Sequence, residues 1–244
     1  MWQGLYCRRD VFVPVAPLCG VASFNAVLFD LDGTLCRNTQ DTRAMYEQAF
    51  EAVGETPFGE PAAFWAALRG PPDHDDPVGY FGAAFARLAA QHGRSDVDPL
   101  ALARALRSAI DNRAVGFTQD AEAAIDQAAD HGPIGIVTNG PDARQRVKLD
   151  ALGIADRFDP IVYAAELARS KPHVKPFEHA VEALDIDREQ VLYVGNSLDY
   201  DVAGAQNAGL PVAWLRGDAE SGDYNPEYVI DSLAELPAIL RGEA

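Results

Sequence analysis

Lysine is scarce in this 244-residue chain, and acidic residues are in large excess. The only lysines are Lys148, Lys171 and Lys175, so arginines make up the rest of the 20 basic residues, against 37 acidic ones and a net charge of −17. This charge argues against a nucleic acid or an anionic membrane as partner. An acidic, lysine-poor composition is typical of halophile proteins, whose self-repulsion is screened by concentrated salt. We therefore expect a halophilic protein, of haloarchaeal type in its composition.

Cysteine and long apolar runs are also lacking. The three cysteines, Cys7, Cys19 and Cys36, are odd in number and form no Cys-x-x-Cys pair, which argues against a disulfide framework or a structural zinc site. No segment approaches the roughly 20 apolar residues that a membrane span needs. We expect a cytoplasmic protein with one large domain, or a medium domain carrying a smaller one.

The first 24 residues do not fit the pattern of the rest. Pro14 and Pro17 interrupt their apolar run, and Asp10 directly follows the pair Arg8-Arg9, which counts against a secretion signal. We expect residues 1–24 to be a poorly ordered extension. A signal and a segment that packs on the fold remain alternatives.

Strand-like and helix-like segments alternate from residue 25 onward. Short apolar runs that end in turn signals predict buried parallel strands, at Asn25–Asp30, Ile134–Thr138, Pro160–Tyr163, Val191–Gly195, Pro211–Leu215 and Tyr228–Ile230. Helical patterns lie between them, near Ala121–Asp130, Pro141–Leu152, Pro176–Leu184 and Val202–Ala208. This alternation predicts an α/β fold, a doubly wound parallel sheet with helices on both faces.

Residues 39–114 break the alternation, because no strand-like run occurs there. Four helical patterns replace it, near Thr42–Val53, Pro61–Leu68, Pro77–His92 and Pro99–Arg113. We therefore expect an all-α cap subdomain at 39–114, inserted into an α/β core formed by 25–38 and 115–244.

Three predicted strands end in polar clusters, and ligands bind outside the carboxyl ends of parallel strands. Asp30 and Asp32 follow the first strand, and Asn196 and Asp201 follow a later one. A carboxylate such as Asp30 can attack phosphorus and form an aspartyl-phosphate. Asp32 can protonate the leaving oxygen and then deprotonate the attacking water. Acidic groups of the last cluster, together with Asp30, suit Mg²⁺.

Other polar residues of the same edge suit a phosphoryl group. Thr138 and the backbone at Asn139 and Gly140 lie at a strand-to-helix turn, where N–H groups can bind phosphate oxygens. The ammonium of Lys171 can offset charge on the nucleophile and the phosphoryl group. The hydroxyl of Thr34 can hold the loop that follows Asp30.

Four segments in this order resemble the haloacid dehalogenase-like hydrolase superfamily, in the branch with a helical cap after the first motif. They are Asp30–Thr34 (Asp-Leu-Asp-Gly-Thr), Ile134–Thr138, Lys171-Pro172 with Phe177, and Gly195–Asp201. Lys175 also precedes a proline and is the alternative motif lysine. The resemblance implies a doubly wound core, catalytic Asp30, Asp32 and Lys171, and phosphate binding by Thr34, Thr138, Asn139, Gly140 and Lys171.

The last motif departs from the family pattern. Asn196 occupies a position where an aspartate usually binds the metal, so Asp201 or Asp199 would have a larger share of that binding. The predicted metal-binding set is Asp30, Asp32, Asn196 and Asp201, with Mg²⁺ as the cofactor.

The resemblance implies a phosphohydrolase of a small phosphorylated metabolite, similar to phosphoglycolate phosphatases and nucleotidases, as a monomer or homodimer. A haloacid dehalogenase needs neither an acid at Asp32 nor a metal, so Asp32 argues against it. A phosphomutase and a catalytically weakened phosphate-binding regulatory protein also remain open.

Overall fold

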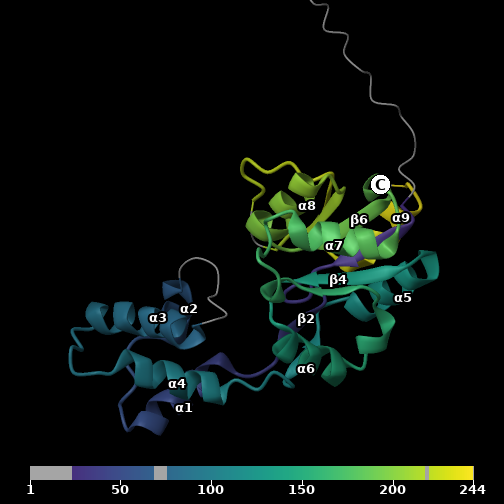
Figure 1. Ribbon diagram of the computed structural model, residues 1–244. Helices are drawn as coiled ribbons and strands as arrows, with labels where there is room; N and C mark the ends of the chain where they lie inside the picture. Colours follow the sequence, from purple (N-terminus) through teal and green to yellow (C-terminus); the bar gives the residue numbers. More distant parts are fainter. Residues whose placement is uncertain (1–23, 69–75, 218–219, 244) are drawn as a thin grey trace, which may run out of the picture.

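The computed structural model describes residues 24–68, 76–217 and 220–243 (Figure 1). Most of the predicted N-terminal extension lies outside these residues. Its last member, Phe24, is instead buried in the core, where its ring meets Tyr228 edge-on at 6.0 Å between centroids.

A six-stranded parallel sheet forms the centre of the larger part of the molecule. Its strand order is β5-β4-β1-β6-β7-β8. The strands are β1 (Ala26–Phe29), β4 (Ile134–Thr138), β5 (Ile161–Tyr163), β6 (Val191–Gly195), β7 (Val212–Leu215) and β8 (Tyr228–Ile230). After β1 the sheet grows first toward β4 and β5, and then on the other side of β1 toward β6, β7 and β8. The topological switch point therefore lies at the carboxyl end of β1, between β4 and β6.

Helices cover both faces of this sheet, because successive strand residues point to opposite sides. Val27 and Phe29 belong to an apolar cluster with α5 (Ala121–His131), α6 (Asp142–Leu152) and α9 (Leu236–Leu240). Ala26 and Leu28 belong to a second cluster with α7 (Lys175–Leu184) and α8 (Ala203–Ala208). Figure 1 shows these helices around the sheet. The predicted doubly wound fold is confirmed.

Four helices form a separate group beside the sheet, in the lower left of Figure 1. They are α1 (Thr42–Val53), α2 (Pro61–Ala67), α3 (Pro77–Gln91) and α4 (Pro99–Ala109). Carboxylates of Asp41, Asp76 and Asp98 accept N–H groups at the starts of α1, α3 and α4, as expected for N-caps. The aromatic rings of this cap region, including Phe64 and Phe85, pack in its own apolar cluster.

A short antiparallel ribbon joins the cap region to the sheet, and the sequence did not predict it. Its strands are β2 (Cys36–Asn38) and β3 (Val115–Phe117), with Cys36 opposite Phe117. The hydroxyl of Thr118 donates to the carbonyl of Thr34 at 2.5 Å, so the end of the ribbon is tied to the loop after β1. Within the described ranges no helix has both the length and the apolar character required to cross a bilayer.

Candidate active site

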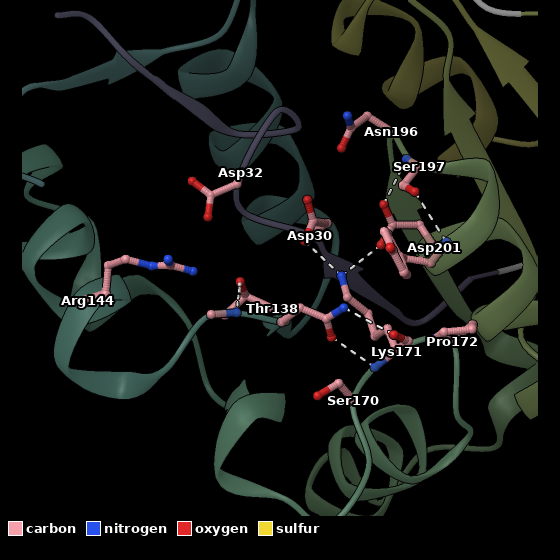
Figure 2. Close-up of a pocket in the computed structure, with 13 residues that line it drawn as sticks. Asp30, Asp32, Thr138, Arg144, Ser170, Lys171, Pro172, Asn196, Ser197 and Asp201 are labelled. Atoms are coloured by element: carbon pink, nitrogen blue, oxygen red, sulfur yellow. Dashed lines mark hydrogen bonds and ion pairs between the residues drawn. The ribbon is translucent and has the colours of Figure 1, made fainter. Parts of the chain in front are cut away.

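A cavity of about 580 Å³ opens at the switch point of the sheet. All of the predicted site residues except Thr34 line it, and Arg144, Ser170, Pro172, Ser197 and Tyr200 complete its wall. The loops after β1, β4 and β6 direct their side chains to this one crevice, and the loop before α7 adds Lys171. Figure 2 shows these side chains converging on it.

Lys171 lies at the centre of this crevice and is almost fully buried. Its ammonium is 2.7 Å from a carboxylate oxygen of Asp30 and 2.7 Å from one of Asp201. The carbonyl of Val137 lies at 2.8 Å and the Tyr193 hydroxyl at 2.9 Å, so four oxygens surround the nitrogen. Lys175, the alternative motif lysine, is exposed and pairs with Glu178 at 2.7 Å. The structure therefore brings Lys171, and not Lys175, to the crevice.

The charges of this buried cluster do not balance, because two carboxylates share one ammonium. Burial raises the pKa of Asp30 to about 7, although the ammonium of Lys171 acts in the opposite direction. Burial lowers the pKa of Lys171, but the carboxylates of Asp201 and Asp30 outweigh this effect and raise it overall. Lys171 is thus held as a cation, and the cluster has one excess negative charge whenever Asp30 is ionised.

Two glycines permit the close packing of the loop after β6. A side chain at Gly195 would meet the Asp201 carboxylate at 2.5 Å, and Gly33 has a positive φ of 87° with the Asn196 amide 2.7 Å from its missing Cβ. The second carboxylate oxygen of Asp201 accepts the backbone N–H of Ser197 at 2.9 Å. Asp201 is therefore fixed on both sides.

Thr34 does not line the cavity but orients groups that do. Its hydroxyl is 3.4 Å from a carboxylate oxygen of Asp30 and 3.2 Å from the amide oxygen of Asn196. Asp199, in contrast, is exposed and accepts the Tyr224 hydroxyl at 2.6 Å. Of the two acids in this motif, Asp201 faces the crevice.

The residues around Asp30 suit a hard divalent cation. Among the described residues no set of three or more His, Cys, Asp and Glu side chains has metal-binding geometry. Here, however, the third oxygen belongs to an amide, that of Asn196, beside the carboxylates of Asp30 and Asp201. Mg²⁺ binds through one or two carboxylates, waters and substrate phosphate, and its charge would offset the excess negative charge of the cluster.

Asp32 points to different partners from those of Asp30. One carboxylate oxygen is 2.5 Å from the ammonium of Lys148, and the other accepts the Gln145 amide at 2.7 Å. Burial alone would raise the pKa of Asp32. The ammonium of Lys148 and the hydrogen bond from Gln145 lower the pKa by more, so the net shift is downward. Because both oxygens bind α6, the carboxylate of Asp32 is turned away from the other predicted metal ligands.

The turn after β4 is linked to both aspartates. The Gln145 amide that binds Asp32 also donates to the Thr138 hydroxyl at 2.7 Å. The side chain of Asn139 binds the backbone of Lys171 in both directions, accepting its N–H at 2.8 Å and donating to its carbonyl at 3.1 Å. Asn139 thus holds the lysine loop, and Gly140 leaves room for Gln145, whose side chain a Cβ there would meet at 2.4 Å.

Sequence reasoning missed the contributions of α6 and of Tyr193. Gln145 and Lys148 are three residues apart on the buried side of the helix, with Leu149. Two polar residues on the face that should be apolar are the signal that could have identified them. Tyr193 had no such signal, because a tyrosine in a buried strand resembles any core aromatic.

The fold and the crevice together define a class of α/β hydrolases with an aspartate after the first strand. The sequence profile of haloacid dehalogenase-like hydrolases matches residues 24–209. The chain belongs to this family, and the predicted phosphatase-type hydrolase is confirmed at the level of the enzyme class.

Named relatives are phosphatases with different substrates. The chain is 33% identical over 173 residues to the pyrimidine 5'-nucleotidase YjjG of Escherichia coli, covering 67% of this chain and 76% of that protein. It is 33% identical over 112 residues to the glyceraldehyde 3-phosphate phosphatase of Methanocaldococcus jannaschii, covering 44% and 49%. The chain thus spans about half the length of the second relative.

Solved structures share the whole fold. The HAD-hydrolase YfnB of Bacillus subtilis, bound to magnesium, has a TM-score of 0.68 at 25% identity, covering 90% of this chain and 99% of that one. A HAD phosphatase of Thermococcus onnurineus has a TM-score of 0.64 at 26% identity, with the same coverage.

Proposed function

We propose that the protein is a Mg²⁺-dependent phosphomonoesterase of a small phosphorylated metabolite. The proposal rests on one observation: two aspartates, two residues apart, enter the same crevice with different partners. Asp30 contacts the buried ammonium of Lys171 at 2.7 Å, and Asp32 contacts Lys148 and Gln145 at the opposite side. Two carboxylates in different environments can perform different tasks in one reaction.

Asp30 is the nucleophile in this proposal. Its carboxylate oxygen attacks phosphorus, the ester oxygen leaves, and an aspartyl-phosphate forms. Lys171 holds the carboxylate in place and offsets the charge of the transferring phosphoryl group. Backbone N–H groups of the turn after β4 and the hydroxyl of Thr138 bind phosphoryl oxygens.

Asp32 transfers the protons. Despite its burial, Lys148 and Gln145 lower its pKa in the free protein, but an anionic substrate beside it raises the pKa again. Asp32 can then donate a proton to the departing alcohol oxygen and later remove one from the water that attacks the aspartyl-phosphate. Lys148 and Gln145 hold the carboxylate of Asp32 in position for both proton transfers. A haloacid dehalogenase would not need this second carboxylate, which is why the phosphatase is preferred.

Asp30, Asn196 and Asp201 would hold the metal. Bound Mg²⁺ supplies positive charge that reduces the repulsion between the anionic nucleophile and the phosphate.

The test is release of phosphate from p-nitrophenyl phosphate with and without Mg²⁺, in molar KCl. We expect turnover that requires Mg²⁺ and is lost, by about a thousandfold or more, in Asp30→Asn. Asp199→Asn is the matched control, because it makes the same change at an exposed acid outside the crevice. Undiminished turnover in Asp30→Asn contradicts the proposal, and metal-independent halide release from 2-chloropropionate would favour the dehalogenase.

A further inference from the structure

A second cavity, of about 350 Å³, lies between the cap region and the sheet and adjoins the crevice. Asp32 and Arg144 line both cavities. The cap region and ribbon contribute Met45, Trp65 and Ile110, among others, and α6 contributes Arg144 and Lys148. A substrate with its phosphate at Asp30 would therefore extend its alcohol part past Asp32 into this cavity.

Two residues that line this cavity each have a buried N–H donor without an acceptor among the described residues. The Nε atom of Arg144 and the indole Nε1 of Trp65 are both buried and form no hydrogen bond. They come from opposite sides, Arg144 from α6 and Trp65 from α2. Because an unpaired buried donor is costly, two of them beside one cavity indicate that an acceptor-rich group binds there.

Arg144 differs from the other arginines of the chain. Among the arginines of the described residues, Arg94 and Arg144 are the two that are half-buried as whole residues. Arg94 pairs with Glu55 at 2.9 Å and with Asp96 at 3.0 Å, but no ion pair is formed by Arg144. In a chain of net charge −17, a half-buried guanidinium without a carboxylate partner is the exception. Figure 2 shows it reaching from α6 toward the crevice.

The charge of the cavity also favours an anion. Asp32 is the only acidic side chain among its lining residues, and Lys148 already pairs with it. Arg144 therefore gives the cavity one uncompensated positive charge. A guanidinium with free N–H groups binds carboxylate and phosphoryl oxygens well, through several donors at once.

We propose that the substrate carries a second anionic group, a carboxylate or a phosphoryl, and that Arg144 binds this group with the help of the Trp65 indole N–H. The proposal rests on the proposed phosphomonoesterase function and names the class of substrate that the same site accepts. It makes Arg144 a residue that determines specificity.

The experiment compares substrates that differ in one charge. We would measure kcat/KM for 2-phosphoglycolate against 2-hydroxyethyl phosphate, and for pyrophosphate against methyl phosphate. The first pair detects a carboxylate site and the second a phosphoryl site. For at least one pair we expect the wild type to prefer the anionic member, and Arg144→Met to reduce this ratio by roughly tenfold to a hundredfold, chiefly through KM.

Two variants make the result specific. Arg144→Lys should retain part of the preference, because it keeps the charge. Arg146→Met is the matched control, since Arg146 lies on the same helix, is exposed and pairs with Asp142; it should leave the ratio unchanged. A wild-type ratio near one for both pairs, or an Arg144→Met ratio equal to that of the wild type, overturns the inference.

A failure of the proposed function gives a different result. If the wild type hydrolyses neither these compounds nor p-nitrophenyl phosphate, the proposed function is wrong, and binding tests the site alone. Calorimetry should then show that phosphonoacetate binds more tightly than ethylphosphonate, and that Arg144→Met removes the difference. Equal affinities in the wild type overturn the inference independently of turnover.

Discussion

The crevice around Asp30 and the cavity beside Trp65 are neighbours, but they are built in opposite ways. In the crevice, Lys171 has four oxygen neighbours and both oxygens of Asp201 are engaged. In the cavity, buried donors of Trp65 and Arg144 have no acceptor. A crevice whose side chains hold one another in place suits chemistry common to many substrates, whereas unpaired donors suit recognition of one.

The largest effect is expected where the crevice loses its central charge. Lys171→Met would leave Asp30 and Asp201 buried without a cation, which typically destabilises a protein by about 3–5 kcal/mol. Lys175→Met, at an exposed ion pair, should change the free energy of unfolding by less than about 0.5 kcal/mol. Denaturant unfolding of both variants checks the difference. If Lys171→Met and Lys175→Met are equally stable, the ammonium of Lys171 does not stabilise the buried carboxylates of Asp30 and Asp201.

A second prediction concerns the excess negative charge of the crevice. The pKa of Asp30 is raised to about 7 by burial, so the folded state favours its neutral form and the metal-free protein loses stability as pH rises toward 7. Asp30→Asn cannot ionise. The free energy of unfolding of Asp30→Asn, minus that of the wild type, should therefore increase by on the order of 2 kcal/mol between pH 5 and pH 7. Above pH 7 this difference should stay constant.

Metal should reverse this difference in stability. Addition of Mg²⁺ at pH 8 should stabilise the wild type more than Asp30→Asn, as measured by thermal unfolding. If the difference in stability between Asp30→Asn and the wild type depends on neither pH nor Mg²⁺, the negative charge of Asp30 and Asp201 is already neutralised within the protein.

The smallest effect is expected at the boundary between the two regions. Lys148→Met or Gln145→Leu removes one partner of Asp32, so its carboxylate would be misplaced for proton transfer, and kcat should fall about tenfold with little change in KM. Lys148→Arg should restore most of the rate. A change confined to KM would instead assign Lys148 and Gln145 to the cavity.

Turn and capping residues in the sequence predicted the bounds of several strands and helices. The apolar runs of β4 and β6 end in turn residues, and both strands have the predicted bounds. Asp41 and Gly54 flank α1, which also matches its prediction. The ribbon escaped notice because each strand has only three residues and its pairing joins Cys36 to Phe117, far apart in the chain. Such pairing depends on tertiary contacts that no local pattern contains.

The same limit applies to the site. Strand ends predicted that Asp30, Thr138 and Asp201 would meet, because parallel topology alone requires it. The bridging position of Lys171 between two carboxylates could not be predicted, since it depends on the path of a loop. The burial of Lys148 had one signal, its position beside Leu149 on the helix face that should be apolar, although a lysine on a helix is normally solvated.

The ribbon of β2 and β3 also has a consequence for the exchange of the segment between its strands. It brings the two ends of residues 39–114 to adjacent positions, with Arg37 opposite Gly116. An insertion whose ends are already side by side imposes no span on the host fold, so one helical segment can be exchanged for another without disturbing the sheet. Exchange of the residues between β2 and β3 for another segment is therefore expected to leave Asp30 in its place after β1.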